Sequence, residues 1–180
     1  MVIRIIFDWE KSGDQNGGRR KRSVDFSGRC EGQEFDAAQE AQHCPLPVRY
    51  NDKYYADALA SGEFTKLAYY CDICVGSIAC RLEKKEGGAV RVYIMTLGVL
   101  APYRGLGVGS KLLNHVLDLC MKQNIGEVYL HVQTNNEDAI KFYKKFGFEI
   151  TETIHNYYTN ITPPDCYVVT KFIAQPQTKK

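Results

Sequence analysis

The sequence predicts a single α/β (α+β) domain with one mixed, mostly antiparallel sheet flanked by helices. Three observations lead to this fold class. From residue 51 onward, short β-branched or aromatic runs alternate with stretches whose apolar residues recur at helical spacing. Two of the helices each connect one strand to the next, and they follow a meander of strands joined by short turns. The length of 180 residues and a hydrophobic content of 44% suit one domain with a sizeable core.

The expected elements begin after residue 50. Helices are expected at 51–60, 110–123 and 136–146, and strands at 65–70, 73–82, 89–100, 127–132, 148–153 and 165–172. Asn51 or Asp52 caps the first helix, because a side-chain oxygen there accepts hydrogen bonds from the first turn. Gly147 ends the last helix, since glycine adopts the left-handed conformation of a helix C-terminus at little cost.

The chain divides into three parts by composition. Residues 1–44 are expected to form a divergent, partly disordered segment, because they are polar and carry few regularly spaced apolar residues. Residues 45–172 are expected to form the domain, and residues 173–180 a polar tail. A basic run at 19–22 leaves a nuclear address open, although a short run of this kind is usually only solvated.

The charge balance and the cysteines argue against several classes of function. The 23 basic and 21 acidic residues give a formal net charge of +2, which offers no argument for a nucleic-acid partner. Seven scattered cysteines, an odd number, indicate reduced thiols and an intracellular, cytoplasmic protein. Cys71 and Cys74 have metal-ligand spacing, but no second pair completes a zinc site, so we expect no metal. No apolar run is long enough to span a membrane, and the opening run is too short for a secretory signal.

The centre of the chain orders a strand, a glycine loop and a helix. The strand ends at Pro102, because proline cannot donate to a ladder. Gly105, Gly107 and Gly109 follow at alternate positions, and Arg104 adds a positive charge. Such a loop points several backbone N–H groups at one spot in front of a helix dipole, which suits a pyrophosphate. For a bare glycine loop the simpler interpretation, a tight strand-to-helix turn, would be favoured.

The Arg-Gly-x-Gly-x-Gly form of residues 104–109 resembles the coenzyme A pyrophosphate loop of the GCN5-related N-acetyltransferase family. Segments 93–97, 101–104, 129–133 and 142–148 extend the resemblance, which runs from about Pro47 to Phe172. It implies acetyl-CoA as acetyl donor, N-terminal peptides of nascent proteins as acceptors, and a NatA-type complex and the ribosome as partners. The coenzyme contacts it implies are Leu97, Gly98, Val99, Arg104, Gly105, Leu106, Gly107, Val108, Gly109, Ser110, Asn136, Ala139 and Tyr143.

The same resemblance assigns the catalytic residues. A lone histidine in a strand, such as His131, would by itself be interpreted as structural. The resemblance maps Tyr93 and His131 onto two residues that remove the amine proton through an ordered water. This chemistry suits an α-ammonium with a pKa near 8 better than a lysine side chain near 10.4. Tyr143 has the helical spacing of a core aromatic, and by resemblance it lies beside the coenzyme sulfur, where its phenol would protonate the thiolate.

The peptide side of the site is expected to be aromatic and apolar. Adjacent tyrosines in a loop, Tyr157 and Tyr158, favour a binding role. By resemblance the slot accepts an initiator methionine, followed by an apolar residue. Leu46 stands where the family has phenylalanine, and the chain before it departs from the family pattern. The expected slot residues are Leu46, Pro47, Val48, Tyr50, Met95, Tyr157, Tyr158 and Ile161.

Three functions remain open at this point. The leading hypothesis is an enzyme that acetylates N-terminal α-amines. The alternatives are a lysine side-chain acetyltransferase and a non-catalytic acetyl-CoA-binding subunit of a ribosome-associated acetyltransferase complex. The presence of Tyr93, His131 and the glycine loop together favours an enzyme.

Overall fold

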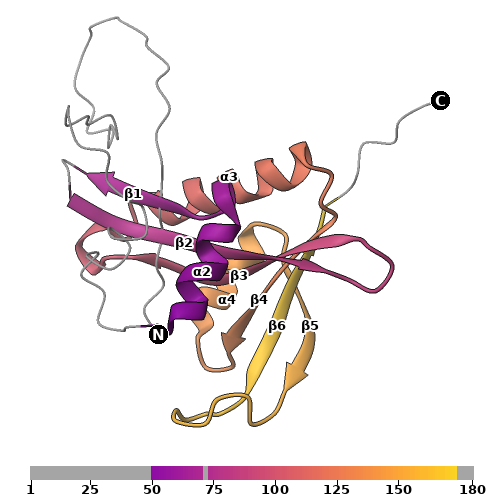
Figure 1. Cartoon of the computed structure of the whole chain (residues 1–180). Helices are drawn as coiled ribbons and strands as arrows, with labels where there is room; N and C mark the ends of the chain where they lie inside the picture. The colour runs from indigo at the N-terminus through magenta and orange to yellow at the C-terminus, as the bar shows by residue number, and fades with distance from the viewer. Residues whose placement is uncertain (1–49, 71–72, 174–180) are drawn as a thin grey trace, which may run out of the picture. The chain divides into compact units, whose positions relative to one another are not determined.

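The computed structural model describes residues 50–70 and 73–173 of the chain (Figure 1). The expected slot residues Leu46, Pro47 and Val48, and the predicted N-terminal segment and C-terminal tail, lie outside the described residues. The elements in chain order are α2 (Asp52–Ala60), η1 (Gly62–Phe64), β1 (Lys66–Tyr70), β2 (Ile73–Lys84), β3 (Val90–Val99), η2 (Ala101–Tyr103), α3 (Val108–Lys122), β4 (Glu127–Gln133), α4 (Glu137–Lys145), β5 (Glu149–Ile154) and β6 (Cys166–Phe172).

The six strands form one mixed sheet, as predicted, in the order β1-β2-β3-β4-β6-β5. The pairs β1–β2, β4–β6 and β5–β6 are antiparallel. Strands β3 and β4 are parallel, with Val92 opposite Val128 and Tyr93 opposite Tyr129. This pair is parallel because helix α3 carries the chain back before β4 begins, which is the crossover that parallel strands require.

The chain folds as two compact units that β2, β3 and α3 connect. We call residues 80–95 and 114–173 the histidine unit, and residues 50–79 and 96–113 the glycine-loop unit. The glycine-loop unit buries a core of large apolar side chains: Phe64, Leu67, Val75, Ile78, Leu97, Leu112 and Leu113. The histidine unit buries another: Val92, Ile94, Val116, Cys120, Val128, Leu130, Val132, Tyr143, Phe148 and Val169. Helix α3 contributes apolar side chains to both cores, because its apolar residues recur at three- and four-residue spacing.

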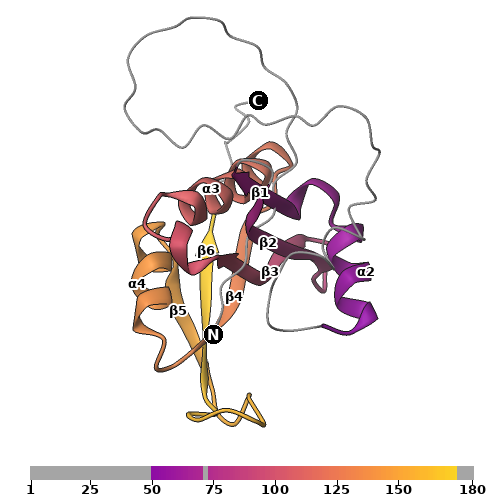
Figure 2. The same ribbon diagram turned by 90° about the vertical axis from the view of Figure 1, so that its left-hand side faces the viewer.

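The helix ends are capped where the sequence predicts caps. The side-chain oxygen of Asn51 accepts a hydrogen bond of 3.0 Å from the Tyr54 backbone N–H, which confirms Asn51 as the cap of α2. Gly147 follows α4 with φ of 76°, as expected for a glycine at a helix C-terminus. Figure 2 shows α4 beside β5, and Lys171 of β6 donates to the backbone carbonyl of Phe146 at the end of α4.

Two classes of feature are missing from the part of the chain that the structure describes. No helix within residues 50–70 and 73–173 combines the length and the apolar character that a membrane span needs. No group of three or more His, Cys, Asp or Glu side chains in these ranges is arranged to hold a metal ion. Cys120 and Cys166 are free thiols.

Candidate functional site

The glycine loop begins where β3 ends. Pro102 lies in the short helix η2, whose turn is closed by a 2.9 Å hydrogen bond from the Tyr103 N–H to the Leu100 carbonyl. The Nε of Arg104 donates to the Val99 carbonyl at 3.0 Å. This bond holds the guanidinium against the end of the strand, so the predicted positive charge is fixed at the start of the loop.

Two glycines of the loop have backbone conformations that other residues rarely adopt. Gly105 and Gly107 have φ of 77° and 81°. Helix α3 begins at Val108, two residues earlier than predicted, because the left-handed turn at Gly107 leads the chain straight into helical geometry. Gly109 and Ser110 therefore lie in the first turn of the helix, not in the loop. The first intrahelical bond runs from the Lys111 N–H to the Gly107 carbonyl at 3.0 Å.

The loop fits an anionic ligand by geometry and by charge. A Cβ atom added at Gly105 or Gly107 would meet no protein atom within 4 Å, so the surface of the loop is open. The first N–H groups of α3 have no acceptor within their own helix, and the positive end of the helix dipole lies beside them. Residues 104–110 include Arg104 and no carboxylate. A pyrophosphate is the group that these features suit best.

The other predicted coenzyme residues have clear structural positions. Leu97, Gly98 and Val99 form the buried end of β3. Asn136 caps α4, with its side-chain oxygen accepting from the Ala139 N–H at 3.1 Å, and the Ala139 side chain is buried. The sequence did not suggest this capping role for Asn136, although Asn before a helix with acidic residues in its first turn is a signal for it.

Tyr143 lies in the core of the histidine unit. Its ring packs at 5.5 Å from Phe148 in an edge-to-face arrangement, and 2% of the residue is exposed. Burial, followed by the nearby Cys80 thiol, raises the pKa of this phenol far above its usual range. Tyr143 therefore keeps its proton at neutral pH, so its hydroxyl can donate a hydrogen bond.

The histidine unit brings Tyr93 and His131 together. The Nδ1 of His131 lies 3.1 Å from the Tyr93 hydroxyl. The two residues come from the neighbouring parallel strands β3 and β4. The Tyr157 ring, from the loop between β5 and β6, stacks on the imidazole with a centroid distance of 4.6 Å and an interplanar angle of 12°. A predicted slot residue thus contacts the predicted base directly.

The environment of this pair keeps His131 neutral and Tyr93 protonated at neutral pH. Burial lowers the pKa of His131 below its ordinary 6.5, an effect that Glu83 and Glu152 oppose and Arg91 adds to. Burial and the neighbouring Tyr157 hydroxyl raise the pKa of Tyr93 well above its usual range. In the tautomer whose Nδ1–H donates to the Tyr93 oxygen, Nε2 carries the lone pair that accepts a proton.

Four polar residues on the same face of the sheet surround this pair, and the sequence interpretation missed them. Glu83 accepts from the Tyr129 hydroxyl at 2.6 Å, from the Arg91 Nε at 3.0 Å, and from Arg81. The Arg81 guanidinium lies 5.0 Å from the centre of the Tyr93 ring. The signal that could have found them is period-two spacing, which places residues i and i+2 of a strand on the same face. Three pairs have this spacing: Arg81 and Glu83, Arg91 and Tyr93, and Tyr129 and His131.

The loop between β5 and β6 (Figure 1) is held at its base by hydrogen bonds of the Asp165 and Gln133 side chains. The carboxylate of Asp165 accepts from the Asn156 N–H at 2.9 Å and lies 3.1 Å from the His155 ring. The buried Gln133 side chain donates to the Pro163 carbonyl at 2.8 Å. Since Gln133 belongs to β4, which also carries His131, this bond connects the tyrosine loop to the strand of His131.

The remaining predicted slot residues are described within the unit to which each belongs. In the histidine unit, Tyr158 is half-buried, Ile161 is 46% exposed, and Met95 is half-buried on β3. In the glycine-loop unit, Tyr50 stacks on Tyr54 with a centroid distance of 4.1 Å. The Tyr54 hydroxyl also forms a 2.6 Å hydrogen bond with the Thr96 hydroxyl, so the Tyr50 ring is held through α2 onto β3.

Comparisons with known proteins agree with the geometry. Residues 32–148 match the model of the acetyltransferase (GNAT) family. N-alpha-acetyltransferase 50 of Danio rerio is 55% identical over 132 residues, which are 73% of this chain and 78% of the relative. The probable N-acetyltransferase san of Drosophila melanogaster is 52% identical over 131 residues, 72% of this chain and 71% of the relative.

A solved structure gives the same result. Arabidopsis thaliana Naa50, in complex with the bisubstrate analogue CoA-Ac-MVNAL, is 74% identical and has a TM-score of 0.69. The match covers 77% of this chain and 95% of that chain. The fold has one mixed sheet and a glycine loop before α3, and the family model matches more than half of the sequence. This chain is therefore a member of the GNAT acetyltransferase family.

Proposed function

We propose that this protein is an N-terminal acetyltransferase that moves the acetyl group of acetyl-CoA to the α-amine of peptides beginning with methionine and an apolar residue. The observation that carries the proposal is the contact between Tyr93, His131 and Tyr157 in the histidine unit. It combines a neutral base with an aromatic surface for a peptide end. The bisubstrate analogue bound to Arabidopsis thaliana Naa50 joins CoA to an acetylated peptide whose first residue is methionine, which supports the choice of side chain.

The chain's own residues have distinct tasks in this reaction. Arg104 and the N–H groups at the start of α3 bind the pyrophosphate of acetyl-CoA, which supplies the acetyl thioester. The neutral imidazole of His131, with Tyr93, accepts a proton from the α-ammonium through an ordered water. The amine lone pair then attacks the thioester carbonyl, and the carbon–sulfur bond breaks. The Tyr143 hydroxyl donates a hydrogen bond to the departing sulfur, which takes its proton from solvent or from the acetylated amine.

The proposed base favours α-amines over lysine side chains. An α-ammonium loses its proton with a pKa near 8, whereas a lysine ammonium has one near 10.4. A histidine whose pKa is below 6.5 is a weak base, so the more acidic ammonium is the one that it can deprotonate at neutral pH. This difference places N-terminal acetylation above the lysine side-chain alternative.

The direct test is an acetylation assay. The purified chain is incubated with acetyl-CoA and a peptide that begins Met-Leu, and the product is located by mass spectrometry. Acetyl on the α-amine supports the proposal. A chain that binds acetyl-CoA without turnover would be the non-catalytic subunit instead, and acetyl on a lysine of an α-blocked peptide alone would make it a side-chain enzyme.

We propose further, from the sequence resemblance, that the protein acts in the cytoplasm as a NatE-type subunit on nascent chains, with a NatA-type complex and the ribosome as partners. Sedimentation of ribosomes from cells that express the tagged chain tests this. Tagged chain in the ribosomal fractions, lost when the NatA-type complex is depleted, is the expected result. A chain found only in free fractions would contradict the partnership and leave the acetyltransferase activity unaffected.

A further inference from the structure

We propose that Glu83 is a positioning residue of this acetyltransferase: its carboxylate holds Tyr129 and Arg81 against Tyr93, and so fixes the phenol that contacts His131. The inference rests on the proposed function, because it explains how the proposed catalytic pair is held. All of the residues involved belong to the histidine unit. Among the described residues of this unit, Glu83 forms no hydrogen bond with Tyr93 or His131. It therefore acts through its neighbours.

The first step is the set of bonds that Glu83 accepts. Its Oε2 accepts from the Tyr129 hydroxyl at 2.6 Å and from the Arg91 Nε at 3.0 Å. Its Oε1 accepts from the Arg81 Nε at 3.0 Å and from the Arg81 terminal nitrogen. Burial alone would raise the pKa of Glu83, but the Tyr129 hydroxyl and the two guanidinium groups outweigh it and lower the pKa. The carboxylate is therefore ionised at neutral pH and uses both oxygens as anchors.

The second step is what these anchored groups touch. The Tyr129 ring lies 4.9 Å from the Tyr93 ring and 5.9 Å from the His131 ring. The Arg81 guanidinium lies 5.0 Å from the centre of the Tyr93 ring. Tyr93 is thus held between an aromatic ring and a cation, and both of these neighbours are bonded to the one carboxylate of Glu83. A shift of either neighbour would move the Tyr93 hydroxyl relative to the His131 Nδ1.

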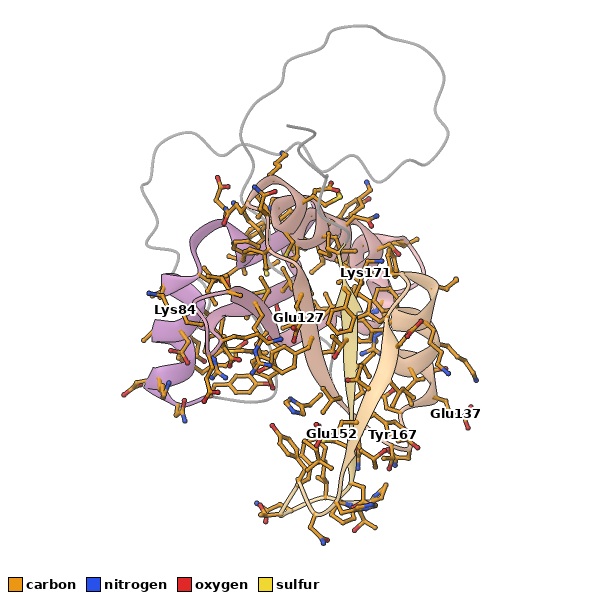
Figure 3. The ribbon with its side chains drawn as sticks, turned by 90° about the vertical axis from the view of Figure 1, so that its right-hand side faces the viewer. Lys84, Glu127, Glu137, Glu152, Tyr167 and Lys171 are labelled. Carbon is orange, nitrogen blue, oxygen red and sulfur yellow. The ribbon has the colours of Figure 1, made fainter. Side chains whose placement is uncertain are left out.

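The third step is charge. The negative charge of Glu83 raises the proton affinity of His131, and the positive charge of Arg91 lowers it. Figure 3 labels Glu152 on β5, whose charge acts on His131 in the same direction as that of Glu83. The titratable and charged groups that face His131 or its immediate neighbours are Arg81 and Glu83 from β2, Arg91 and Tyr93 from β3, Tyr129 from β4, Glu152 from β5 and Tyr157 from the loop.

The main experiment is the pH profile of kcat/KM for the full chain with Glu83→Gln. The substitution removes the charge and one acceptor oxygen, so the acid limb of the profile should move to lower pH. Loosening of Tyr93 should lower kcat by up to about 10²-fold, the cost of a misplaced reacting group. The KM for the peptide and the affinity for acetyl-CoA should change little. Glu83→Asp keeps the charge, so its acid limb should stay close to that of the wild type.

Glu127 provides a matched control on the same face of the histidine unit. Its carboxylate pairs with Arg91 at 3.6 Å and with Lys85. Among the described residues of this unit, it forms no hydrogen bond or ion pair with Tyr129 or Arg81. Figure 3 labels Glu127 on β4. Glu127→Gln should leave both kcat and the acid limb unchanged. If Glu127→Gln reproduced the effects of Glu83→Gln, a general loss of charge would explain them and the positioning role would be wrong.

Two further measurements test the inference, one by a readout other than activity and one with a second variant in case Glu83→Gln folds poorly. An NMR titration of the His131 ring, assigned with His131→Asn, should show a lower pKa in Glu83→Gln than in the wild type. Tyr129→Phe keeps the ring but removes its bond to Glu83, and it should lower kcat while the charge of Glu83 remains. The inference would be overturned if the wild type were active, Glu83→Gln left the pKa of His131 unshifted, and Tyr129→Phe kept the full wild-type kcat. A wild type without acetyl transfer would instead overturn the proposed function.

Discussion

At the residue scale, the Tyr93–His131 pair leads to a prediction about rate. Tyr93→Phe and His131→Ala should each lower kcat by roughly 10²–10⁴-fold, the usual loss when a general base is removed. Binding of acetyl-CoA should remain nearly intact, because neither residue belongs to the glycine loop. Single-turnover kinetics and isothermal titration separate the two effects. Tyr167→Phe, which removes the hydroxyl of a half-buried tyrosine of β6, is the control and should retain wild-type kcat.

The glycine loop leads to a second prediction at this scale. Gly107→Val should strongly weaken binding of acetyl-CoA, because its side chain would fill the open surface in front of α3. The backbone strain must be separated from this effect. Gly88 has φ of 84°, close to the 81° of Gly107, and equally open surroundings, so Gly88→Val carries a similar strain. If titration calorimetry showed equal losses of affinity for both variants, the pyrophosphate assignment would be wrong.

The sequence resemblance pointed to the pair that the structure brings together, but not to the residues that support it. The catalytic role of Tyr93 and His131 rests on that resemblance, since neither residue alone differs from a structural one. Glu83 and Tyr129 were missed because their role depends on strands β2, β3 and β4 meeting on one face. Each strand shows period-two spacing by itself, but which face of one strand meets which face of the next is decided by register, a property of the folded sheet.

At the element scale, the tyrosine loop leads to a prediction about peptide binding. Gln133→Leu removes the hydrogen bond to the Pro163 carbonyl and leaves that carbonyl without its donor from β4. The loop that carries Tyr157 should then be less well held, so the KM for the peptide should rise while acetyl-CoA affinity stays the same. The loss of a buried hydrogen bond should also reduce the free energy of unfolding by about 1–3 kcal/mol.

The control for this prediction lies in the same hairpin. The Thr151 hydroxyl bonds the Thr170 hydroxyl at 3.0 Å, between β5 and β6 and away from the loop base. Thr151→Val should lower stability without raising the peptide KM. Thermal denaturation and steady-state kinetics on both variants decide the matter. A rise in KM that simply follows the loss of stability in both would mean that Gln133 has no specific role in holding the loop.

Element boundaries followed from the sequence to within two residues. Two boundaries deviate by two residues, the end of β2 and the start of α3, and the second has a physical cause. Asn51 and Gly147 were identified as caps because capping depends on the chemistry of single residues. The start of α3 was placed two residues too late. The alternate spacing of the glycines predicts that all three lie in the loop, whereas the positive φ of Gly107 already completes the turn and allows Gly109 to be helical.

At the scale of the whole molecule, the fold class was predictable and the internal arrangement was not. Alternating strands and helices indicate one mixed sheet, and the structure confirms it. The strand order, in which β6 lies between β4 and β5, depends on contacts far apart in the sequence. The division into two compact units also cuts through β2, β3 and α3, so no change in composition along the chain marks it.

The last prediction concerns substrate choice by the whole protein. Tyr157, Tyr158 and Ile161 offer an aromatic and apolar surface, and no carboxylate or cation occurs among the proposed slot residues. An acidic first side chain would need a cation there, and a lysine substrate would benefit from acidic neighbours, so a long apolar side chain such as methionine should be preferred. By resemblance, Leu46 replaces a phenylalanine that the family has at the edge of the proposed slot. A change of this size in a pocket is worth about 1–3 kcal/mol, so the preference should survive while KM rises.

The test compares kcat/KM for peptides that begin Met-Leu, Ser-Glu and Asp-Asp, and for a lysine peptide blocked at its α-amine. We expect Met-Leu to exceed the others by about 10–200-fold, the ratio that apolar pocket contacts supply. Leu46→Phe should lower the KM for Met-Leu, and the KM for Ser-Glu much less, because a larger ring adds contact only to an apolar side chain. A KM for Met-Leu that does not change would mean that Leu46 lies outside the slot. Equal kcat/KM for Met-Leu and Asp-Asp would mean that the aromatic surface does not select the first residue at all.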